Sequence, residues 1–376
     1  MEPQEEEGSV TMRIREKRGL KPFAIALVVM ALVAASCGDS DDTTTTAAPG
    51  TTAAATTAAP AATGLEAVCA AGAEEGSFTY WATIEVDNFA RIIEPFEARY
   101  PDIDIEFLSI REEDGAAQIL TEVSAGVQPT PDMVYGSQDG LSPIITRGLI
   151  DTEFDWSQAG IDDELMLQPE NMVRIFLVAF GLAYNTNLGT PEDLPQTWEE
   201  LVDSKWAGNV VTDPRGNPFH LLLIEWSEEE VLDYATRFAA ESEPILIRGG
   251  TAGMTEVLSG GALMTTSGRA DSRSELQADG APIEMHYLDI VPIRVLYNGL
   301  IKDAANPNAA ACFAGWLATD EGQTSFESVE YKSNEFPPAG VPEDAILSRV
   351  TSPEQAQAIN DIQQRIQEII APDFEG

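Results

Sequence analysis

Two arginines follow predicted strands at positions where they could bind an anion. Arg215 lies in a turn, 213–218, between a β-prone run at 209–212 and an apolar helical segment at 219–226. Unpaired backbone amides and the positive end of a helix attract phosphate or carboxylate groups. Arg269 follows another β-prone run, and a guanidinium fork suits a carboxylate or phosphonate. Ion pairing is the alternative for both residues: Arg215 on the surface, and Arg269 with Asp271 or another acidic residue of the same lobe.

Residue counts and motifs argue against several other chemistries. Two histidines and three cysteines are few for a zinc enzyme or a disulfide-rich mini-fold. The sequence contains neither a Gly-x-Ser-x-Gly nor a His-Glu-x-x-His motif. A carboxylate pair of the kind used in glycoside hydrolysis remains open, because 63 acidic residues always supply pairs. We therefore expect no enzyme, and we keep a secreted hydrolase as an alternative.

The charge of the chain restricts its partners. Its 376 residues include 21 Lys and Arg against 63 Asp and Glu, which gives a formal net charge of −42. A nucleic-acid binder needs a basic face, and an anionic membrane surface also attracts basic segments. We therefore expect no nucleic-acid partner. The length is sufficient for two lobes of ordinary domain size.

The N-terminal segment is typical of a secretory signal. Residues 1–36 contain a basic run from Arg13 to Lys21 and then an apolar run, 22–36, that ends in small residues. The apolar run has roughly 15 residues, fewer than the ~20 that a membrane-spanning helix needs. Met12, which precedes the basic run, is a possible true start. The sequence therefore predicts export from the cytoplasm.

A cysteine follows the signal directly. The segment Val33-Ala34-Ala35-Ser36-Cys37 resembles the lipobox of bacterial lipoproteins. This resemblance implies cleavage before Cys37, lipidation of its thiol and attachment to the membrane through the lipid alone. An ordinary signal followed by a chance cysteine is the alternative. We assign residues 37–74 to a Thr/Ala/Pro-rich linker, in which 39–63 lacks large apolar residues and should be disordered.

Strand and helix patterns alternate in the remainder. Apolar residues predict strands at 78–83, 103–107 and 132–135, separated by helical patterns at 86–96 and near 119–123. This βαβαβ order favours a parallel sheet with helices on its faces, in which ligands bind beyond the carboxyl ends of the strands. Further patterns are a long apolar run at 173–184, strands at 262–266, 283–288 and 293–301, and helices starting near Thr197, Ser227, Asn308 and Pro353.

Four motifs in this order resemble a known family. The motifs lie at 79–81 (Thr-Tyr-Trp), 180–186 (Phe-Gly-Leu-Ala-Tyr-Asn-Thr), 194–208 (Leu-Pro-Gln-Thr-Trp-Glu-Glu-Leu, then Lys-Trp-Ala-Gly) and 306–323 (Asn-Pro-Asn-Ala-Ala, then Trp-Leu-Ala-Thr-Asp-Glu-Gly-Gln). Together they look like the extracellular solute-binding proteins of ABC importers, in the branch that includes ferric-iron binders. The resemblance covers residues 75–373.

The resemblance implies a type II periplasmic-binding-protein fold of two α/β lobes. We expect lobe 1 at 75–178 plus 291–330 and lobe 2 at 179–290 plus 331–376, joined by crossover strands with a ligand cleft between them. Closure of the hinge on a small solute would then present the protein to an ABC permease and its ATPase. The implied protein is a monomer without a cofactor. It would lie outside the cytoplasm, lipid-anchored in a periplasm or at the outer face of the cytoplasmic membrane.

The family's iron ligands have no match here. The paired tyrosines of the ferric branch correspond to 265–271, where this sequence has none, and no carboxylate matches at 135–138. Iron therefore remains an alternative only, although Glu85, Glu113 and Asp114 leave another cation open. We expect an anionic or zwitterionic organic solute and no metal. The expected binding residues are Thr83, Glu85, Ser137, Gln138, Tyr184, Arg215, Gly216, Asn217, Ser267 and Arg269.

The other candidate residues are expected to have structural roles. Cys69 and Cys312 remain after Cys37, and thiols outside the cytoplasm tend to oxidise, so we expect a Cys69–Cys312 disulfide, with free thiols as the alternative. His220 and His286 are expected to be structural residues of lobe 2. A structural surface lipoprotein that binds no small molecule is the remaining alternative function.

Overall fold

Parallel strands alternate with helices in the first part of the fold, as the sequence predicts. The computed structural model describes residues 11–13 and 63–374. Strand β2 pairs in parallel with both β3 and β4, and helices connect these strands. The elements of this part are β2 (Ser77–Ala82), α2 (Val86–Arg99), β3 (Asp104–Ser109), α3 (Glu112–Ser124), β4 (Met133–Ser137) and α4 (Ser142–Ile145).

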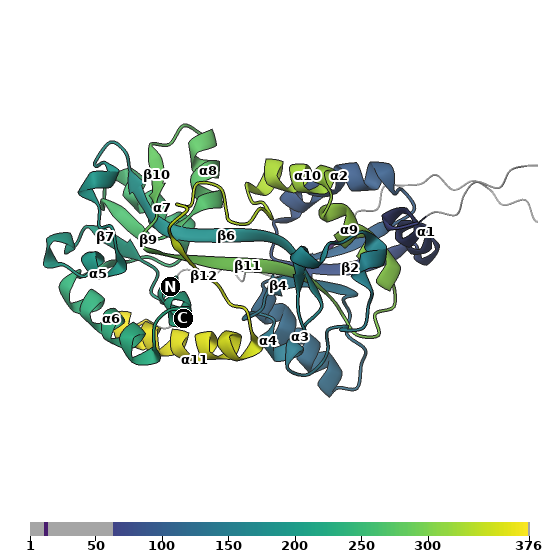
Figure 1. Cartoon of the computed structure of the whole chain (residues 1–376). Helices are drawn as coiled ribbons and strands as arrows, with labels where there is room; N and C mark the ends of the chain where they lie inside the picture. Colours follow the sequence, from purple (N-terminus) through teal and green to yellow (C-terminus); the bar gives the residue numbers. More distant parts are fainter. Residues whose placement is uncertain (1–10, 14–62, 375–376) are drawn as a thin grey trace, which may run out of the picture. The chain divides into compact units, whose positions relative to one another are not determined.

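Two long antiparallel strands, β6 (Met172–Asn185) and β11 (Ile290–Leu300), continue the sheet (Figure 1). The strand order is β1-β3-β2-β4-β11-β6-β9-β7-β8, so β11 and β6 lie in the middle. Three short strands pair with these two outside that order. The remaining strands are β1 (Thr11–Arg13), β5 (Met166–Leu167), β7 (Val210–Thr212), β8 (Ile245–Leu246), β9 (Met264–Arg269), β10 (Ile283–His286) and β12 (Ile346–Ser348).

The second group of helices surrounds β7, β8 and β9. The helix predicted to start near Ser227 is α6, where Ser227 and Glu230 form a capping box, and Thr197 accepts a hydrogen bond from the amide of Glu200 at the start of α5. These helices are α5 (Trp198–Leu201), α6 (Glu228–Glu241), α7 (Gly250–Ser259), α8 (Ala270–Ala278) and α11 (Pro353–Ile370). The 3-10 helices of the chain are Trp156–Ala159, Asp163–Leu165, Pro191–Asp193, Ser204–Trp206 and Phe219–Ile224.

One predicted helix takes a different form. The segment 219–226 was expected to be an α-helix, but Phe219–Ile224 is a 3-10 helix. Ser227 caps the next helix, α6, so the segment between Pro218 and this cap is short. Short connecting segments often form 3-10 helices, because an α-helix gains little from so few internal hydrogen bonds.

Two hydrophobic cores lie toward opposite ends of the long strands. In the first, Phe89 and Phe96 of α2 pack with Tyr80, Phe107 and residues of α9 and α10. In the second, Trp198, Phe219, Tyr234 and Phe238 pack with one face of α11. The spacing of Ile359, Ile362, Ile366 and Ile369 predicts one buried face of this helix; the first three are buried, whereas Ile369 is half-buried and Ile370 is buried instead. A ligand-binding site can therefore form between the two cores, next to β6 and β11.

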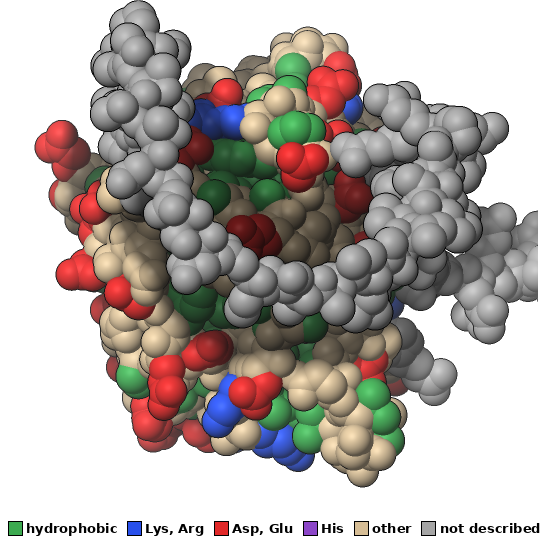
Figure 2. All heavy atoms as spheres, turned by 90° about the vertical axis from the view of Figure 1, so that its right-hand side faces the viewer, with side chains coloured by type: hydrophobic (Ala, Val, Ile, Leu, Met, Phe, Trp, Pro, Cys, Tyr) green, Lys and Arg blue, Asp and Glu red, His purple; other side chains and the backbone are tan. Residues whose placement is uncertain are grey.

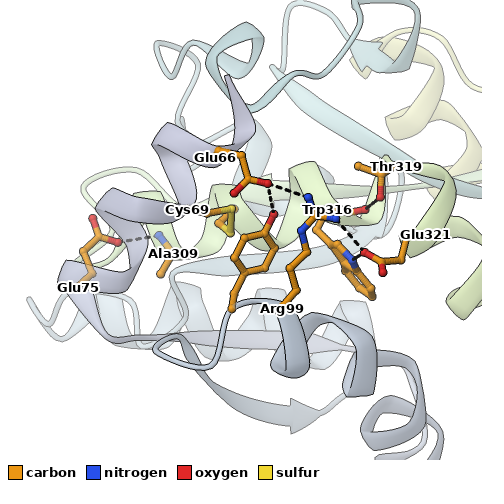
Figure 3. The surroundings of a disulfide bond; sticks show 10 residues. Glu66, Cys69, Glu75, Arg99, Ala309, Trp316, Thr319 and Glu321 are labelled. Atoms are coloured by element: carbon orange, nitrogen blue, oxygen red, sulfur yellow. Dashed lines mark hydrogen bonds and ion pairs between the residues drawn. A yellow bond between two sulfur atoms is a disulfide. The ribbon is translucent and has the colours of Figure 1, made fainter. Parts of the chain in front are cut away.

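A disulfide bond joins the first described helix to a late one (Figure 3). Cys69 of α1 (Leu65–Glu75) is bonded to Cys312 of α9 (Pro307–Leu317), so the expected pairing is present. Glu66 accepts from Arg99 at 2.7 Å, and Glu75 accepts from the amide of Ala309 at 2.7 Å. Helix α10 (Asp320–Glu330) follows α9.

Helix α1 corrects the predicted end of the linker. Residues 65–74 were assigned to the linker, but they form most of α1 and belong to the first core. Val68 and Cys69 are buried there, and the disulfide fixes the helix against α9. The predicted signal segment, apart from β1, and the predicted lipidation site Cys37 lie outside the described residues. Within the described residues, no helix is long and apolar enough to cross a membrane.

Candidate functional site

A cavity of about 280 Å³ lies between the two cores, against β6 and β11. Its walls come from the ends of β2 and β4 with the start of α3, from the two long strands, from the end of β9, and from the turn after β7 with the 3-10 helix that follows it. Gly250 and Lys332 complete the lining. We call it the central cavity. Phe176, Val178, Phe180 and Leu296 form an apolar wall on the long strands. The carboxyl ends of β2, β7 and β9 all contribute residues, as expected for a ligand site in an α/β sheet.

Four cationic side chains line the central cavity: Arg215, Arg269, Arg294 and Lys332. Each is paired with carboxylates. Arg215 binds Asp213, Arg269 binds Asp271, Arg294 binds Glu112 and Asp139, and Lys332 binds Glu330. Lys332 also lies 5.0 Å from the centre of the Phe176 ring. The cations therefore come from separate elements and converge on one space.

The arginines are exposed to the cavity to a greater extent than their partners are. The side chains of Arg215, Arg269 and Arg294 are 36%, 32% and 32% exposed, whereas those of Asp213, Asp271 and Glu112 are 2%, 7% and 7% exposed. The carboxylates thus lie behind the guanidinium groups and hold them in place. This arrangement contrasts with the outer surface, where acidic side chains are widespread on the face shown in Figure 2. In a chain of net charge −42, the cavity presents its positive groups inward.

The Arg294 cluster is built on the first turn of α3 and the end of β4. Arg294 Nη2 donates to Glu112 Oε1, to Ser137 Oγ at 2.9 Å and to Asp139 Oδ2 at 3.3 Å. Glu112 Oε2 accepts from the backbone amide of Ser137 at 2.5 Å. Gly140 leaves room for this carboxylate, because a Cβ there would lie 2.4 Å from Glu112 Cδ. Arg294 Nη2 and Glu112 are therefore each held by several groups, whereas Arg294 Nε is buried without a hydrogen-bond partner.

The turn after β7 is closed by its own hydrogen bonds. Asp213 accepts from the backbone amide of Arg215 at 2.9 Å and from Arg215 Nε at 3.0 Å, while the amide of Gly216 donates to the Asp213 carbonyl at 3.0 Å. The amides of Arg215 and Gly216 are therefore engaged within the turn. The expected role of these two amides in binding an anion is not supported. Arg215 and Asn217 contribute their side chains to the cavity instead.

Ser267 joins the turns after β7 and β9. Its hydroxyl donates to the carbonyl of Asn217 at 2.9 Å and accepts from the amide of Asp213 at 3.3 Å. The backbone amide of Gly249 donates to Asp213 Oδ2 at 3.0 Å. These bonds position Arg215 and Arg269 on the same side of the cavity.

Burial changes the charge of several groups in the site. It lowers the pKa of His220 to about 4, so this histidine is neutral at pH 7. It raises the pKa of Glu112 to about 7, against the opposing effect of Arg294. Burial also raises the pKa of Tyr135 well above its usual range. For Asp213, burial raises the pKa, but the hydrogen bonds from Arg215 lower it by a larger amount. The pKa therefore lies below its usual value and the carboxylate stays ionised.

Half of the expected binding residues line the central cavity. These are Thr83, Arg215, Asn217, Ser267 and Arg269. Arg269 also makes the ion pair with Asp271 that was its alternative role, and Arg215 makes an ion pair with Asp213. The two roles are compatible, because each pair leaves its guanidinium partly exposed at the cavity.

The other expected residues lie outside its lining. Tyr184 is buried in the second core with Trp198, because β6 runs on past the cavity. Glu85 is exposed at the N-cap of α2, and Gly216 packs against α11, where a Cβ would lie 2.6 Å from Ile366 Cγ2. Ser137 is buried behind the cavity, where it holds Glu112 and Arg294. Gln138 is buried and donates to Glu170 at 2.7 Å.

Several functional candidates were not expected from the sequence. Arg294, Lys332, Glu112 and Asp213 line the cavity, and so does His220, which was assigned a structural role. Arg294 carried a signal that could have found it: it is a charged residue inside the otherwise apolar strand Ile290–Leu300. Lys332 lies in an irregular segment after α10 and carries no such signal. In the described part of the chain, no group of three or more His, Cys, Asp or Glu side chains could hold a metal ion.

Solved structures show the same fold. Iron-bound HitA from Pseudomonas aeruginosa matches with a TM-score of 0.66 at 18% identity, covering 77% of this chain and 99% of that one. A ferric binding protein from Campylobacter jejuni matches with a TM-score of 0.64 at 13% identity, covering 78% and 99%. AfuA from Actinobacillus pleuropneumoniae, with fructose-6-phosphate bound, matches with a TM-score of 0.58 at 18% identity, covering 78% and 97%.

These neighbours identify the architecture as the two-lobed type II periplasmic-binding-protein fold. No curated protein sequence matches the chain. The family model of the bacterial extracellular solute-binding proteins matches residues 91–330, which is more than half of the chain. The chain therefore belongs to the bacterial extracellular solute-binding proteins.

Proposed function

We propose that this protein is the lipid-anchored receptor of an ABC importer and that its central cavity captures a small anionic or zwitterionic organic solute through the solute's acidic group. The solute is handed unchanged to a permease and its ATPase, and the protein is not an enzyme. The observation that carries the proposal is the inward-facing cluster of Arg215, Arg269, Arg294 and Lys332 in a strongly acidic chain. Guanidinium groups held by buried carboxylates need little reorganisation to bind an anion.

The distribution of the cores supports closure of two lobes around this cavity. The first core contains residues from 68–178 and 296–326, and the second contains residues from 182–238, 264–290 and 362–370. This distribution supports two lobes with the proposed limits, with α1 added to lobe 1. The cavity has walls from both sets, so a bound anion contacts both lobes and stabilises the closed state.

The nature of the cavity favours an anion over iron, which HitA and the Campylobacter protein bind. The carboxylates at the cavity are already engaged by the four cations rather than free to ligate a trivalent cation, and Tyr135 is the one tyrosine among the lining residues. AfuA, which holds fructose-6-phosphate, shows that the same fold accommodates a phosphate ester. Ferric iron therefore remains the second candidate only, and a phosphate, phosphonate or carboxylate ligand is the first.

Anchoring follows from Cys37 and the segment before it. We infer that the signal is cleaved before Cys37 and that the linker holds the receptor near its permease, in a periplasm or at the outer face of the cytoplasmic membrane, as a monomer. Expression in a bacterial host with a labelled fatty acid tests this point. Label should enter the intact protein and be absent from Cys37→Ser; equal labelling of both would exclude the anchor.

A thermal-shift screen of the mature chain tests the ligand class. The library contains sugar phosphates, phosphonates, organic acids and amino acids, with polyamines and ferric salts as cationic comparisons. Stabilisation by anions alone, without product formation, supports the proposal. Turnover would indicate a hydrolase, stabilisation by ferric salts alone would indicate an iron receptor, and no stabilisation by any compound would favour a structural lipoprotein.

A matched pair of variants then locates the binding. Arg269→Gln should weaken binding of the stabilising anion by roughly 10- to 100-fold, which corresponds to one lost charged hydrogen bond. Arg237→Gln, on the exposed face of α6 and paired with Glu199 and Asp233, should bind as the wild type does. Calorimetry gives both dissociation constants. Equal affinity of Arg269→Gln and Arg237→Gln would place the anion elsewhere.

A further inference from the structure

A second cavity, of about 390 Å³, is lined by Arg174 of β6, Tyr297 of β11 and Arg349, which follows β12. Leu165, Met166 and Val350 add apolar wall, and exposed Glu164 is its one acidic lining residue. None of the expected binding residues is among the described residues that line this space. It lies against the same two long strands as the central cavity, so its position relative to them decides whether it is a separate site.

A β-bulge places Arg174 on the opposite face of β6 from the central cavity. Leu296 pairs with Phe176, but the register then shifts and Tyr297 pairs with Arg174, so Ile175 is the extra residue. In a regular strand, residues 174 and 176 would share a face. The bulge instead gives Arg174 the face of Tyr297, while Phe176 and Leu296 face the central cavity. The two cavities therefore lie on opposite faces of the long strands.

The arginines of the second cavity differ from those of the central cavity in having no carboxylate partner. Within residues 63–374, neither Arg174 nor Arg349 takes part in an ion pair. Arg174 Nε is buried and has no hydrogen-bond partner. Arg349 lies 4.4 Å from the centre of the Phe336 ring, which leaves its N–H groups without an acidic acceptor. A buried charged donor without an acceptor is costly, and its presence needs an explanation.

We propose that the second cavity is a binding site for the carboxylate or phosphate group of a small organic anion. Arg174 and Arg349 supply the opposite charge, and the hydroxyl of Tyr297 supplies a further donor. The apolar wall accommodates a hydrocarbon or aromatic portion of the same molecule. An anion in this position gives the unpartnered donor its acceptor and reduces the repulsion between the two guanidinium groups.

The electrostatics of the second cavity agree with this assignment. Burial raises the pKa of Tyr297 to about 12, so its hydroxyl keeps its proton at neutral pH and can donate. Burial lowers the pKa of the Arg174 guanidinium from its ordinary value, and the field of Arg349 acts in the same direction. The charge of a bound anion opposes both effects on Arg174 by favouring the protonated guanidinium.

The site would connect the long strands to the segment that enters α11. Arg174 and Tyr297 belong to β6 and β11, whereas Arg349 and Val350 lie between β12 and α11. A small space lined by Tyr297 and Val350 is also lined by Arg294 of the central cavity. An anion in the second cavity would therefore contact the two strands that cross between the cores, whichever solute the central cavity binds.

Phenyl phosphate and inorganic phosphate are suitable probes, titrated into the mature chain by calorimetry at constant ionic strength. Wild type and the central-cavity variant Arg269→Gln/Arg294→Gln should both bind phenyl phosphate more tightly than inorganic phosphate. Added to the central-cavity variant, so that only the second cavity can bind, Arg174→Gln/Arg349→Gln should lower the affinity for phenyl phosphate by at least about tenfold. Arg147→Gln, an exposed arginine near α4, serves as the control and should leave binding unchanged.

Thermal unfolding without ligand distinguishes a loss of binding from a loss of folding. Because neither Arg174 nor Arg349 has an ion-pair partner to lose, and their mutual repulsion is removed, Arg174→Gln/Arg349→Gln should melt close to the temperature of the wild type. A phenyl phosphate affinity equal to that of Arg147→Gln would overturn the assignment. Loss of binding in Arg269→Gln/Arg294→Gln alone would do the same, because it would place the probe in the central cavity.

Discussion

Arg294 and Glu112, 182 residues apart in the chain, form an ion pair at the central cavity. Arg294 comes from the middle of β11, and Glu112 occupies the first turn of α3. The buried carboxylate fixes the guanidinium, while the guanidinium remains one-third exposed to the cavity. The pair therefore joins a strand that crosses between the cores to the helix that follows β3. It also holds the positively charged guanidinium that an anionic ligand would contact.

This pair predicts that the affinity for an anionic solute depends on pH. Burial raises the pKa of Glu112 to about 7, and a bound anion would raise it further, so binding takes up a proton. Affinity should therefore rise as the pH falls from 8 to 6, by less than tenfold per pH unit. Calorimetry across this range measures the slope. Glu112→Gln, which stays neutral, should show a flatter profile, and an identical slope in both proteins would contradict the prediction.

His220 predicts a loss of stability at acidic pH. Its pKa in the folded protein is about 4, whereas an exposed histidine titrates near 6.5. The unfolded chain therefore binds more protons between these values, and the folded state loses roughly 2–3 kcal/mol as the pH falls from 7 to 4.5. Urea unfolding at both pH values measures the change. In His220→Gln the free energy of unfolding should fall by less over the same range; an equal fall would contradict the prediction.

The periodic elements of the fold were predictable because each pattern reports a single buried face. The alternation at 103–107 and the helical spacing in 86–96 correspond to β3 and α2. Side-chain capping is equally local, which is why Ser227 and Glu230 predict the start of α6. Helices α7 and α8 were not predicted, because their short and weakly patterned segments owe their form to packing against β9 and β10.

The candidate site was only half predictable, because its geometry depends on pairing between distant segments. Thr83, Arg215 and Arg269 follow strands, so the rule for strand ends finds them. Arg294 lies inside a strand and reaches the cavity because β11 crosses between the two cores. Tyr184 was expected to bind the solute but does not line the cavity, because β6 continues past the cavity into the second core.

The β-bulge opposite Tyr297 could not be predicted either. It depends on the register between β6 and β11, and no residue type in 172–178 marks Ile175 as the extra one. Without the bulge, strict alternation assigns Arg174 to the face of Phe176. The second cavity therefore follows from the structure alone.

The disulfide predicts a large loss of stability when it is removed. Cys69 and Cys312 close a loop of 243 residues, and a cross-link over so long a loop restricts the unfolded chain strongly. Cys69→Ser/Cys312→Ser should lower the free energy of unfolding by roughly 3–5 kcal/mol. Urea unfolding measures it, with wild type in a reducing agent as the matched control. Equal stability of the oxidised wild type and the double variant would show that α1 is held by its other contacts.

Gly216 and Gly208 offer a matched pair for the turn that carries Arg215. Both have a positive φ, at 82° and 71°, but a Cβ at Gly216 would lie 2.6 Å from Ile366 of α11, whereas nothing lies within 4 Å of one at Gly208. Gly208→Ala should therefore cost only the backbone strain of about 1–2 kcal/mol. Gly216→Ala carries the same strain and must also displace α11.

The expected result is that Gly216→Ala is the less stable of the two by about 1–3 kcal/mol, which is typical of overpacking. Urea unfolding measures this difference. Because the displaced turn also carries Arg215 and Asn217, Gly216→Ala should bind the solute more weakly than Gly208→Ala in calorimetry. If the two variants match in stability and in affinity, the close approach of the turn to α11 does not position Arg215.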